Sequence, residues 1–204
     1  VSYRSNNTDT PEPYEINITL FDAMKESFNK EVSLYVERFI CIHAIMLSLE
    51  GVPAFYIHSL FGTQNDYALY EKTNQNRSLN RGKVKISEVD LSKQSDTKSY
   101  IFMELRKLML IRKKQHAFHP NAVQFTLHLG SSLYGIWRQS LDKKQSIFCI
   151  SNLTDKEVKL SLLDLNLIGF DHWRDLITEI KIEDITSDIA FKPYQTMWLT
   201  NLSN

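Results

Sequence analysis

The feature that most constrains the fold is an apolar segment that ends at a glycine and a proline and is followed by a polar loop. Residues 39–49 are apolar nearly all round, which is typical of a buried helix, and Gly51 and Pro53 end that helix. The next apolar run, residues 52–57, predicts a short buried strand. The chain then becomes rich in arginine and asparagine. A buried strand followed by such a loop is typical of the carboxyl edge of a parallel β/α sheet, where ligands bind.

Helical periodicity identifies two long helices in the first part of the chain. The stronger one covers residues 31–49, and the second covers residues 95–115, with basic residues in its last turn. A shorter helix is predicted within residues 18–30, and a helical turn or two within residues 66–72. We therefore expect a mainly helical first part that contains one clear strand.

From residue 119 onward the periodicity changes from helical to alternating, with turn residues between short runs. The predicted strands cover residues 124–129, 133–138, 146–151, 158–162, 173–176, 180–182, 189–191 and 196–200. Short strands at this spacing predict an antiparallel β-sandwich.

These patterns predict an α/β part over residues 1–118 and an all-β domain over residues 119–204. One strand cannot form a sheet, and a closed barrel of parallel strands needs about eight. The first part is therefore interpreted as an incomplete (β/α)8 barrel, and the chain as the carboxyl-terminal portion of a longer enzyme.

Composition excludes some functional classes. Lysine plus arginine and aspartate plus glutamate number 24 each, so the formal net charge is zero, which argues against a nucleic-acid or membrane-surface partner. The run at residues 39–49 is too short to span a bilayer, and the first ten residues are polar, so we expect a cytoplasmic protein. His116 and His119 lack a cysteine or acidic partner, and we expect neither a metal nor another cofactor.

Several motifs resemble the sucrose phosphorylase group of the α-amylase superfamily, glycoside hydrolase family 13. They are Gly51-Val-Pro-Ala-Phe-Tyr56, then Asn65-Asp66, then Thr73-Asn-Gln-Asn-Arg-Ser-Leu-Asn-Arg81. Pro13-Tyr-Glu-Ile-Asn17 with Phe21-Asp-Ala23 is similar to the loop after the seventh barrel strand of that group, and Pro193 to Leu199 is similar to its final strand. The resemblance covers nearly the whole chain and implies part of a barrel followed by a β domain.

Two details refine this resemblance. Ordinary amylases carry an acidic residue soon after the Gly-x-Pro-x-x-Tyr motif, whereas this chain has Ser59-Leu-Phe61, which favours the phosphorylase branch over a hydrolase. Sucrose phosphorylases carry Tyr-Gln where this chain has Tyr14-Glu15. The Tyr-Glu form is similar to relatives that act on glucosylglycerate or on phosphorylated sucrose.

The resemblance implies a retaining phosphorylase that uses an α-glucoside and inorganic phosphate. One carboxylate attacks the anomeric carbon, a second carboxylic acid protonates the leaving group, and phosphate accepts the glucosyl unit. In the family these acids lie on earlier barrel strands, so we expect no catalytic residue in this chain; Glu12, Glu15 and Asp22 do not match their motif positions. The rest of its own barrel, or another copy of the chain, would have to complete the site.

The resemblance also implies the substrate-binding residues. Arg81 matches the arginine that binds the glucosyl ring, and Arg77 and Asn80 belong to the same motif. A guanidinium group suits vicinal hydroxyls or a phosphate. Tyr14 and Glu15 match a loop that exchanges acceptor sugar for phosphate. The alternatives are an ion pair or ordinary loop role for these residues, a β domain that binds glycan without catalysis, and a family 13 enzyme that hydrolyses glucosides.

Overall fold

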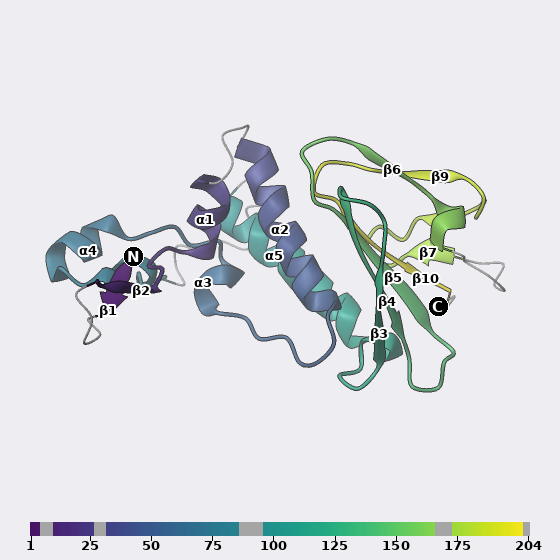
Figure 1. Ribbon diagram of the computed structural model, residues 1–204, viewed down its shortest axis with the longest axis horizontal. Coiled ribbons are helices and arrows are strands. Elements are labelled where there is room, and N and C mark those ends of the chain that lie inside the picture. Colours follow the sequence, from purple (N-terminus) through teal and green to yellow (C-terminus); the bar gives the residue numbers. More distant parts are fainter. Residues whose placement is uncertain (5–9, 27–31, 86–95, 166–172, 202–204) are drawn as a thin grey trace. The chain divides into compact units, whose positions relative to one another are not determined.

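The computed structural model describes residues 1–4, 10–26, 32–85, 96–165 and 173–201 (Figure 1). The chain forms two compact units, each built from two stretches of sequence. The first contains Val1–Lys30 and Phe55–Met103, and the second contains Glu31–Ala54 and Glu104–Asn204. The predicted division at residue 118 into a partial barrel and a β-sandwich stays a prediction. The two compact units are defined by contacts between residues, and they do not show which residues belong to a larger barrel.

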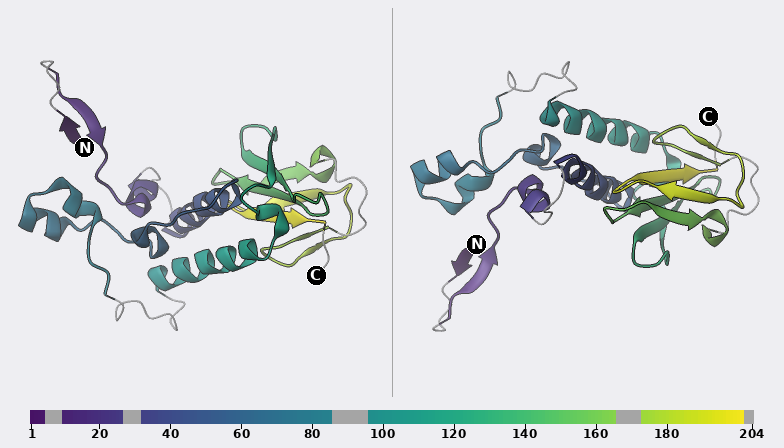
Figure 2. Two further views of the ribbon diagram at one scale, coloured as in Figure 1. Left: turned by 90° about the horizontal axis from the view of Figure 1, so that it is seen from below. Right: turned by 90° about the horizontal axis from the view of Figure 1, so that it is seen from above.

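The first unit contains a two-stranded hairpin and several short helices, and Figure 2 shows the hairpin in purple. Its elements are β1 (Ser2–Arg4), β2 (Glu12–Glu15), α1 (Leu20–Glu26), α3 (Ile57–Leu60), α4 (Tyr67–Thr73), the 3-10 helix η1 (Asn76–Asn80) and the first turns of α5 (Thr97–Lys113). The short helix expected within residues 18–30 and the turns expected at residues 66–72 are confirmed as α1 and α4.

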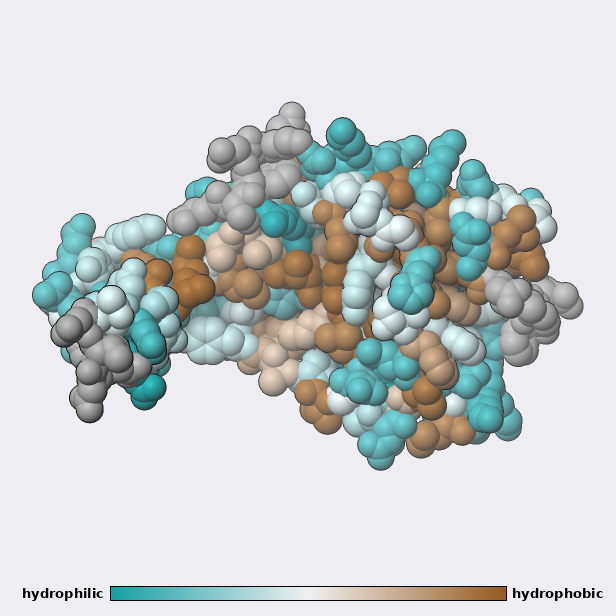
Figure 3. Space-filling model, in the orientation of Figure 1, coloured by the Kyte–Doolittle hydropathy of each residue, from teal (hydrophilic) through white to brown (hydrophobic). Residues whose placement is uncertain are grey.

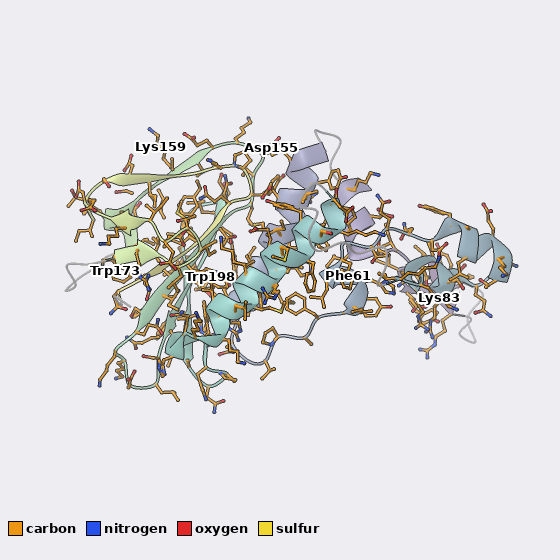
Figure 4. The ribbon with its side chains drawn as sticks, turned by 180° about the vertical axis from the view of Figure 1, so that it is seen from behind. Phe61, Lys83, Asp155, Lys159, Trp173 and Trp198 are labelled. Carbon is orange, nitrogen blue, oxygen red and sulfur yellow. The ribbon has the colours of Figure 1, made fainter. Side chains whose placement is uncertain are left out.

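Close packing in the first unit depends on Gly62. Its φ of +53° lies in the left-handed region, and an added Cβ would lie 2.5 Å from Ile101 Cδ1. Ile101 is fully buried and Phe21 nearly so. Beside them the rings of Phe61, labelled in Figure 4, and Phe102 stack with centroids 5.3 Å apart. This packing holds the segment after Tyr56 against the start of α5 without any strand.

The strand expected at residues 52–57 is absent, and that prediction was wrong. Residues 52–56 have no regular secondary structure, and α3 begins at Ile57. A strand requires a neighbour to pair its backbone groups, and no described strand pairs with this segment. Apolar composition alone does not supply the pairing partner.

The second unit contains α2 (Val32–Ser48), the rest of α5 and two antiparallel sheets. α2 and α5 confirm the two predicted long helices. The remaining elements are η3 (His116–Phe118), β3 (Val123–Leu127), β4 (Leu133–Gln139), β5 (Ser146–Asn152), β6 (Val158–Ser161), η4 (Leu162–Leu165), β7 (Trp173–Asp175), β8 (Lys181–Ile182), β9 (Asp188–Phe191) and β10 (Thr196–Thr200). Every strand predicted after residue 119 is thus confirmed, with ends shifted by at most two residues.

The larger sheet has the strand order β3-β4-β5-β10-β7-β8, and β6 pairs with β9 in a separate ribbon. A cluster of buried hydrophobic side chains forms the core between the larger sheet and this ribbon. It includes Phe148 and Ile150 from β5 and Leu160 and Phe191 from the ribbon. β5 is buried at all seven positions because it lies in the middle of the sheet. The antiparallel sheets are as predicted, whereas the sandwich and barrel descriptions stay predictions.

Two arginines join the carboxyl end of α2 to the rest of the second unit. Arg112 donates from Nη1 to the Leu47 carbonyl at 2.8 Å and from Nη2 to the Gly51 carbonyl at 2.9 Å. Arg138, which is fully buried, donates to the Ser48 carbonyl at 3.1 Å and also to two carbonyls after η3. The last carbonyls of a helix lack partners within the helix and carry partial negative charge, so guanidinium donors suit them.

We expect Arg138→Met to lower the free energy of unfolding by about 2–3 kcal/mol, because it leaves several buried carbonyls without donors. Urea unfolding followed by tryptophan fluorescence measures this, since Trp198 is fully buried in the same unit. Arg106→Met makes the same chemical change at an exposed position of α5 and should have little effect. Equal losses for the two variants would contradict the proposed role of Arg138.

Candidate functional site

The hairpin of the first unit positions Tyr14 and Glu15. β1 and β2 are antiparallel, with Ser2 opposite Glu15 and Tyr3 opposite Pro13. Pro13 fixes its own φ at a value compatible with an edge strand, and it restricts the residue before it to extended conformations. Asn17 Nδ2 then donates to Ser2 Oγ at 2.7 Å and fixes the chain beyond β2.

The asparagine-rich segment that carries the arginines folds as a helix, a tight turn and a 3-10 helix. Asp66 accepts from the Leu69 amide at 2.8 Å and caps the start of α4. Asn74 ends α4 in the left-handed conformation, with φ of 49°, where asparagine is tolerated. Thr73 Oγ1 donates to Ser78 Oγ at 2.7 Å. The Thr-Asn prefix of the motif therefore has a local structural role in placing η1.

Arg77, on η1, contacts Tyr14 and Glu15 of the hairpin strand β2. Its Nε lies 3.0 Å from both carboxylate oxygens of Glu15, and its Nη2 lies 3.5 Å from the Tyr14 hydroxyl. Glu15 holds the pKa of the Arg77 guanidinium above its usual range. The side chains remain 51% and 28% exposed, so the pair adds little to stability and its charges stay accessible to a ligand.

Asn80 and Arg81 follow at the end of η1. The Asn80 carbonyl accepts from the Tyr56 hydroxyl at 3.4 Å, and the Arg81 amide donates to the Ser78 carbonyl at 3.3 Å. The Arg81 side chain is exposed and makes no hydrogen bond or ion pair with a described residue. At Gly82 an added Cβ would lie 3.1 Å from Asp66 Oδ2, so this glycine lets the loop pass close to the start of α4.

Of the five predicted site residues, the structure brings Tyr14, Glu15 and Arg77 together. The backbone carbonyl of Asn80 accepts a hydrogen bond from Tyr56, and the Arg81 guanidinium contacts no described residue by a hydrogen bond or ion pair. Lys83, two residues beyond Arg81, marks this loop in Figure 4. The roles of all five in substrate binding stay predictions.

A small pocket beside this cluster includes residues that sequence reasoning missed. It has a volume of about 190 Å³ and is lined by the residues before and at the start of α1 and by Tyr56, His58, Ser59 and Asn80. Burial lowers the pKa of the His58 imidazole, so the ring is neutral near pH 7. The one feature of the sequence that could have pointed to His58 is its position directly after the apolar run that ends at Ile57.

The carboxylates near this region already have partners. Glu15 pairs with Arg77, Asp22 Oδ2 accepts from the Asn65 amide at 2.7 Å, and Asp66 caps α4. Each of the three therefore makes a structural contact in this arrangement. Among the described residues, no group of three or more His, Cys, Asp or Glu side chains could hold a metal ion. No helix in the described parts of the chain is long and apolar enough to cross a membrane.

A row of aromatic residues crosses the larger sheet. Phe125, Trp137, Phe148 and Trp173 follow one another with ring centroids 4.8, 5.7 and 5.4 Å apart. Phe125 is 44% exposed, but Phe148 is only 6% and Trp173 only 3% exposed. Figure 4 shows Trp173 and Trp198 among the strands. The row runs into the core instead of along a surface, which is the arrangement of packing residues and not of a platform for sugar rings.

The fold and the site can be compared with known proteins. No protein-family model matches the chain. The chain is 36% identical over 204 residues to a glucosylglycerate phosphorylase of Escherichia coli (strain K12), covering 98% of this chain and 34% of the relative. It is 34% identical over 202 residues to the enzyme of the same name from Allomeiothermus silvanus, covering 96% and 33%. The chain thus spans about a third of the length of the curated relatives it matches.

Solved structures of α-amylase-type enzymes share the fold. A variant of AmyP in complex with maltotriose matches with a TM-score of 0.67 and 16% identity, covering 88% of this chain and 37% of that one. Pullulanase from Anoxybacillus sp. LM18-11 matches with a TM-score of 0.65 and 15% identity, covering 91% and 26%.

These matches define the class of protein: the chain has the fold of a carboxyl-terminal portion of glycoside hydrolase family 13 enzymes. Within that class it is similar to the sucrose phosphorylase-like group, and the relatives named above are glucosylglycerate phosphorylases. The resemblance expected from the sequence motifs is confirmed.

Proposed function

We propose that the chain supplies substrate-binding loops to a retaining α-glucoside phosphorylase of the sucrose phosphorylase-like group. The observation that carries the proposal is the meeting of Tyr14 and Glu15 with Arg77, because two family motifs 62 residues apart converge at one accessible cluster of charges. The relatives, each named glucosylglycerate phosphorylase, favour glucosylglycerate as the α-glucoside.

In this proposal Arg77 and Arg81 provide the cationic groups. Arg81, free of protein partners among the described residues, binds the hydroxyls of the glucosyl unit, and its planar fork of donors suits a vicinal pair. Arg77 and Tyr14 bind the group that replaces the acceptor. Glu15 serves as the counter-charge of Arg77 and is displaced when phosphate enters, since both anions compete for one guanidinium.

The nucleophile, the general acid and the remaining barrel strands come from outside the chain, from a preceding part of the same protein or from another copy. α2 offers a surface for them. Ile42, Ile45 and Met46 are only half-buried, and Figure 3 shows hydrophobic residues, in brown, where α2 reaches the surface. Adjacent partly exposed apolar side chains on a helix are typical of a surface that another element covers.

The proposal predicts that the complete enzyme converts glucosylglycerate to glucose 1-phosphate only when inorganic phosphate is present. We also expect Glu15→Gln to lower the KM for phosphate about fivefold, because a negative charge near the incoming anion is removed. Initial rates at varied phosphate concentration and low ionic strength measure both effects, since salt screens exposed charges.

Glu71→Gln is the matched control, because it removes the same charge from an exposed position of α4. It should leave the KM for phosphate unchanged. Release of free glucose without phosphate would instead identify a family 13 hydrolase, and glycan binding without turnover would identify a non-catalytic module. Either result would overturn the proposal.

A further inference from the structure

A larger pocket lies entirely within the second unit. It has a volume of about 460 Å³, which falls within the range of about 300–1,000 Å³ that is typical of small-molecule sites. Its lining comes from α2, from α5, from the turn after β7 and from the turn between β9 and β10. All of these residues belong to the second unit, and none of the five predicted site residues is among them.

The most buried part of the lining is mainly apolar and carries no charge. Ala44 and Leu108 are 1% and 3% exposed, and Cys41 and Tyr194 are also buried. Burial raises the pKa of the Cys41 thiol and of the Tyr194 hydroxyl, so both groups are neutral near pH 7. This part of the pocket therefore accommodates an aliphatic or aromatic group and disfavours a charged one.

Tyr194 takes an unusual backbone conformation to form this wall. Its φ of +54° lies in the left-handed region, which is rare for a bulky side chain. Its amide donates to the Thr154 carbonyl at 3.2 Å, which holds the turn in place. Conformations of this kind persist only where the surrounding structure supports them, and they cluster at ligand-binding sites.

The rim of the pocket carries charges of both signs. Glu104, on α5, is half-buried, and Lys192, in the turn between β9 and β10, is exposed. Neither side chain makes a hydrogen bond or an ion pair with a described residue. Glu37 adds a second carboxylate to the lining. Opposite charges thus border one apolar pocket, and Glu104 and Lys192 do not pair with each other.

The threonine hydroxyls of the lining, in contrast, already have partners. Thr196 Oγ1 and Ser151 Oγ share a hydrogen bond of 2.7 Å, and Thr178 Oγ1 donates to Asp175 Oδ2 at 2.7 Å. The charged groups at the rim are therefore the main polar partners that a ligand would find there.

We propose that this pocket binds a small zwitterion with an apolar body, of which an apolar α-amino acid is the simplest example. The apolar body occupies the buried part, the ammonium group faces Glu104, and the carboxylate group faces Lys192. A singly charged molecule would leave one of the two rim charges without a partner. Binding is non-covalent, and the proposal does not depend on the proposed function.

The direct test uses the complete protein with ¹³C-labelled isoleucine δ1 methyl groups. Ile40 and Ile177 line the pocket, whereas Ile189 packs against the hydrophobic cluster of the sheets and is the matched control. Three probes share a phenyl ring: L-phenylalanine carries both charges, 2-phenylethylamine only the ammonium, and 3-phenylpropionate only the carboxylate.

We expect L-phenylalanine to shift the methyl resonances of Ile40 and Ile177 and to leave Ile189 in place. At low ionic strength it should bind about threefold more tightly than either singly charged probe, as expected for one further exposed ion pair. Unchanged Ile40 and Ile177 resonances up to the solubility limit of L-phenylalanine overturn the proposal. So does a singly charged probe that binds as tightly as L-phenylalanine.

Charge-removing variants provide the second arm. Glu104→Gln should weaken L-phenylalanine and 2-phenylethylamine about threefold and leave 3-phenylpropionate unchanged. Lys192→Gln should weaken L-phenylalanine and 3-phenylpropionate and leave the amine unchanged. Lys107→Gln, at an exposed position of α5 outside the lining, should alter none of the three. Equal weakening of all three probes by either rim variant overturns the proposal, and the wild-type order of affinities decides the matter if a variant fails to fold.

Discussion

The 204-residue chain is expected to show no phosphorolysis of an α-glucoside by itself. A retaining mechanism needs two carboxyl groups about 5–5.5 Å apart, one as nucleophile and one as acid and base. In the first unit, Glu15 is paired with Arg77, and Asp22 and Asp66 accept hydrogen bonds from backbone amides. These three carboxylates hold the loops in place, and we expect none of them to attack or protonate a substrate.

A coupled assay for glucose 1-phosphate measures this, with the purified chain at high concentration and glucosylglycerate plus phosphate as substrates. The complete enzyme is the positive control. Turnover that copurifies with the chain through two different columns, and that is lost on Glu15→Gln, would show that the chain holds its own catalytic carboxylate. The interpretation as an incomplete barrel would then be wrong.

Arg81→Ala in the complete enzyme is expected to lower kcat/KM for phosphorolysis about 150-fold. This corresponds to about 3 kcal/mol, the loss expected when a charged hydrogen-bond donor to the substrate is removed. The guanidinium makes no hydrogen bond or ion pair with a described residue, so its removal breaks no described protein contact. The effect should therefore appear in catalysis and not in the thermal midpoint of unfolding.

Arg106→Ala is the matched control, because Arg106 is exposed on α5. It should leave both kcat/KM and the thermal midpoint near their wild-type values. Arg81→Lys tests the geometry, since an ammonium keeps the charge but not the planar fork, and we expect only partial recovery. Wild-type kinetics for Arg81→Ala would remove Arg81 from the sugar-binding site.

Sequence patterns predicted the helices and the later strands well because those signals are local. α2 and α5 have strong helical periodicity and clear end signals, and β3 to β10 come from short runs that are separated by turn residues. The strand expected at residues 52–57 failed because strand pairing depends on a distant neighbour, which an apolar run does not encode. The hairpin of β1 and β2 had no counterpart among the predicted strands, for the same reason.

The family motifs predicted the candidate site only in part. They singled out Arg77, Glu15 and Tyr14 separately, as substrate-binding residues. They could not show that Glu15 and Arg77 pair with each other, because 62 residues separate them. His58 was not singled out by any motif, and the pocket that it lines became visible only in the structure.

The sequence by itself determined most of the element types and the resemblance to sucrose phosphorylase-like enzymes, because periodicity, end signals and motif residues are local features of the chain. The tertiary structure alone decided which charges meet, which carboxylates already have partners and which arginine makes no polar contact with a described residue. Those outcomes depend on distances between segments remote in the chain. They are set by packing of the whole unit, as at Gly62 and Gly82, and not by any local pattern.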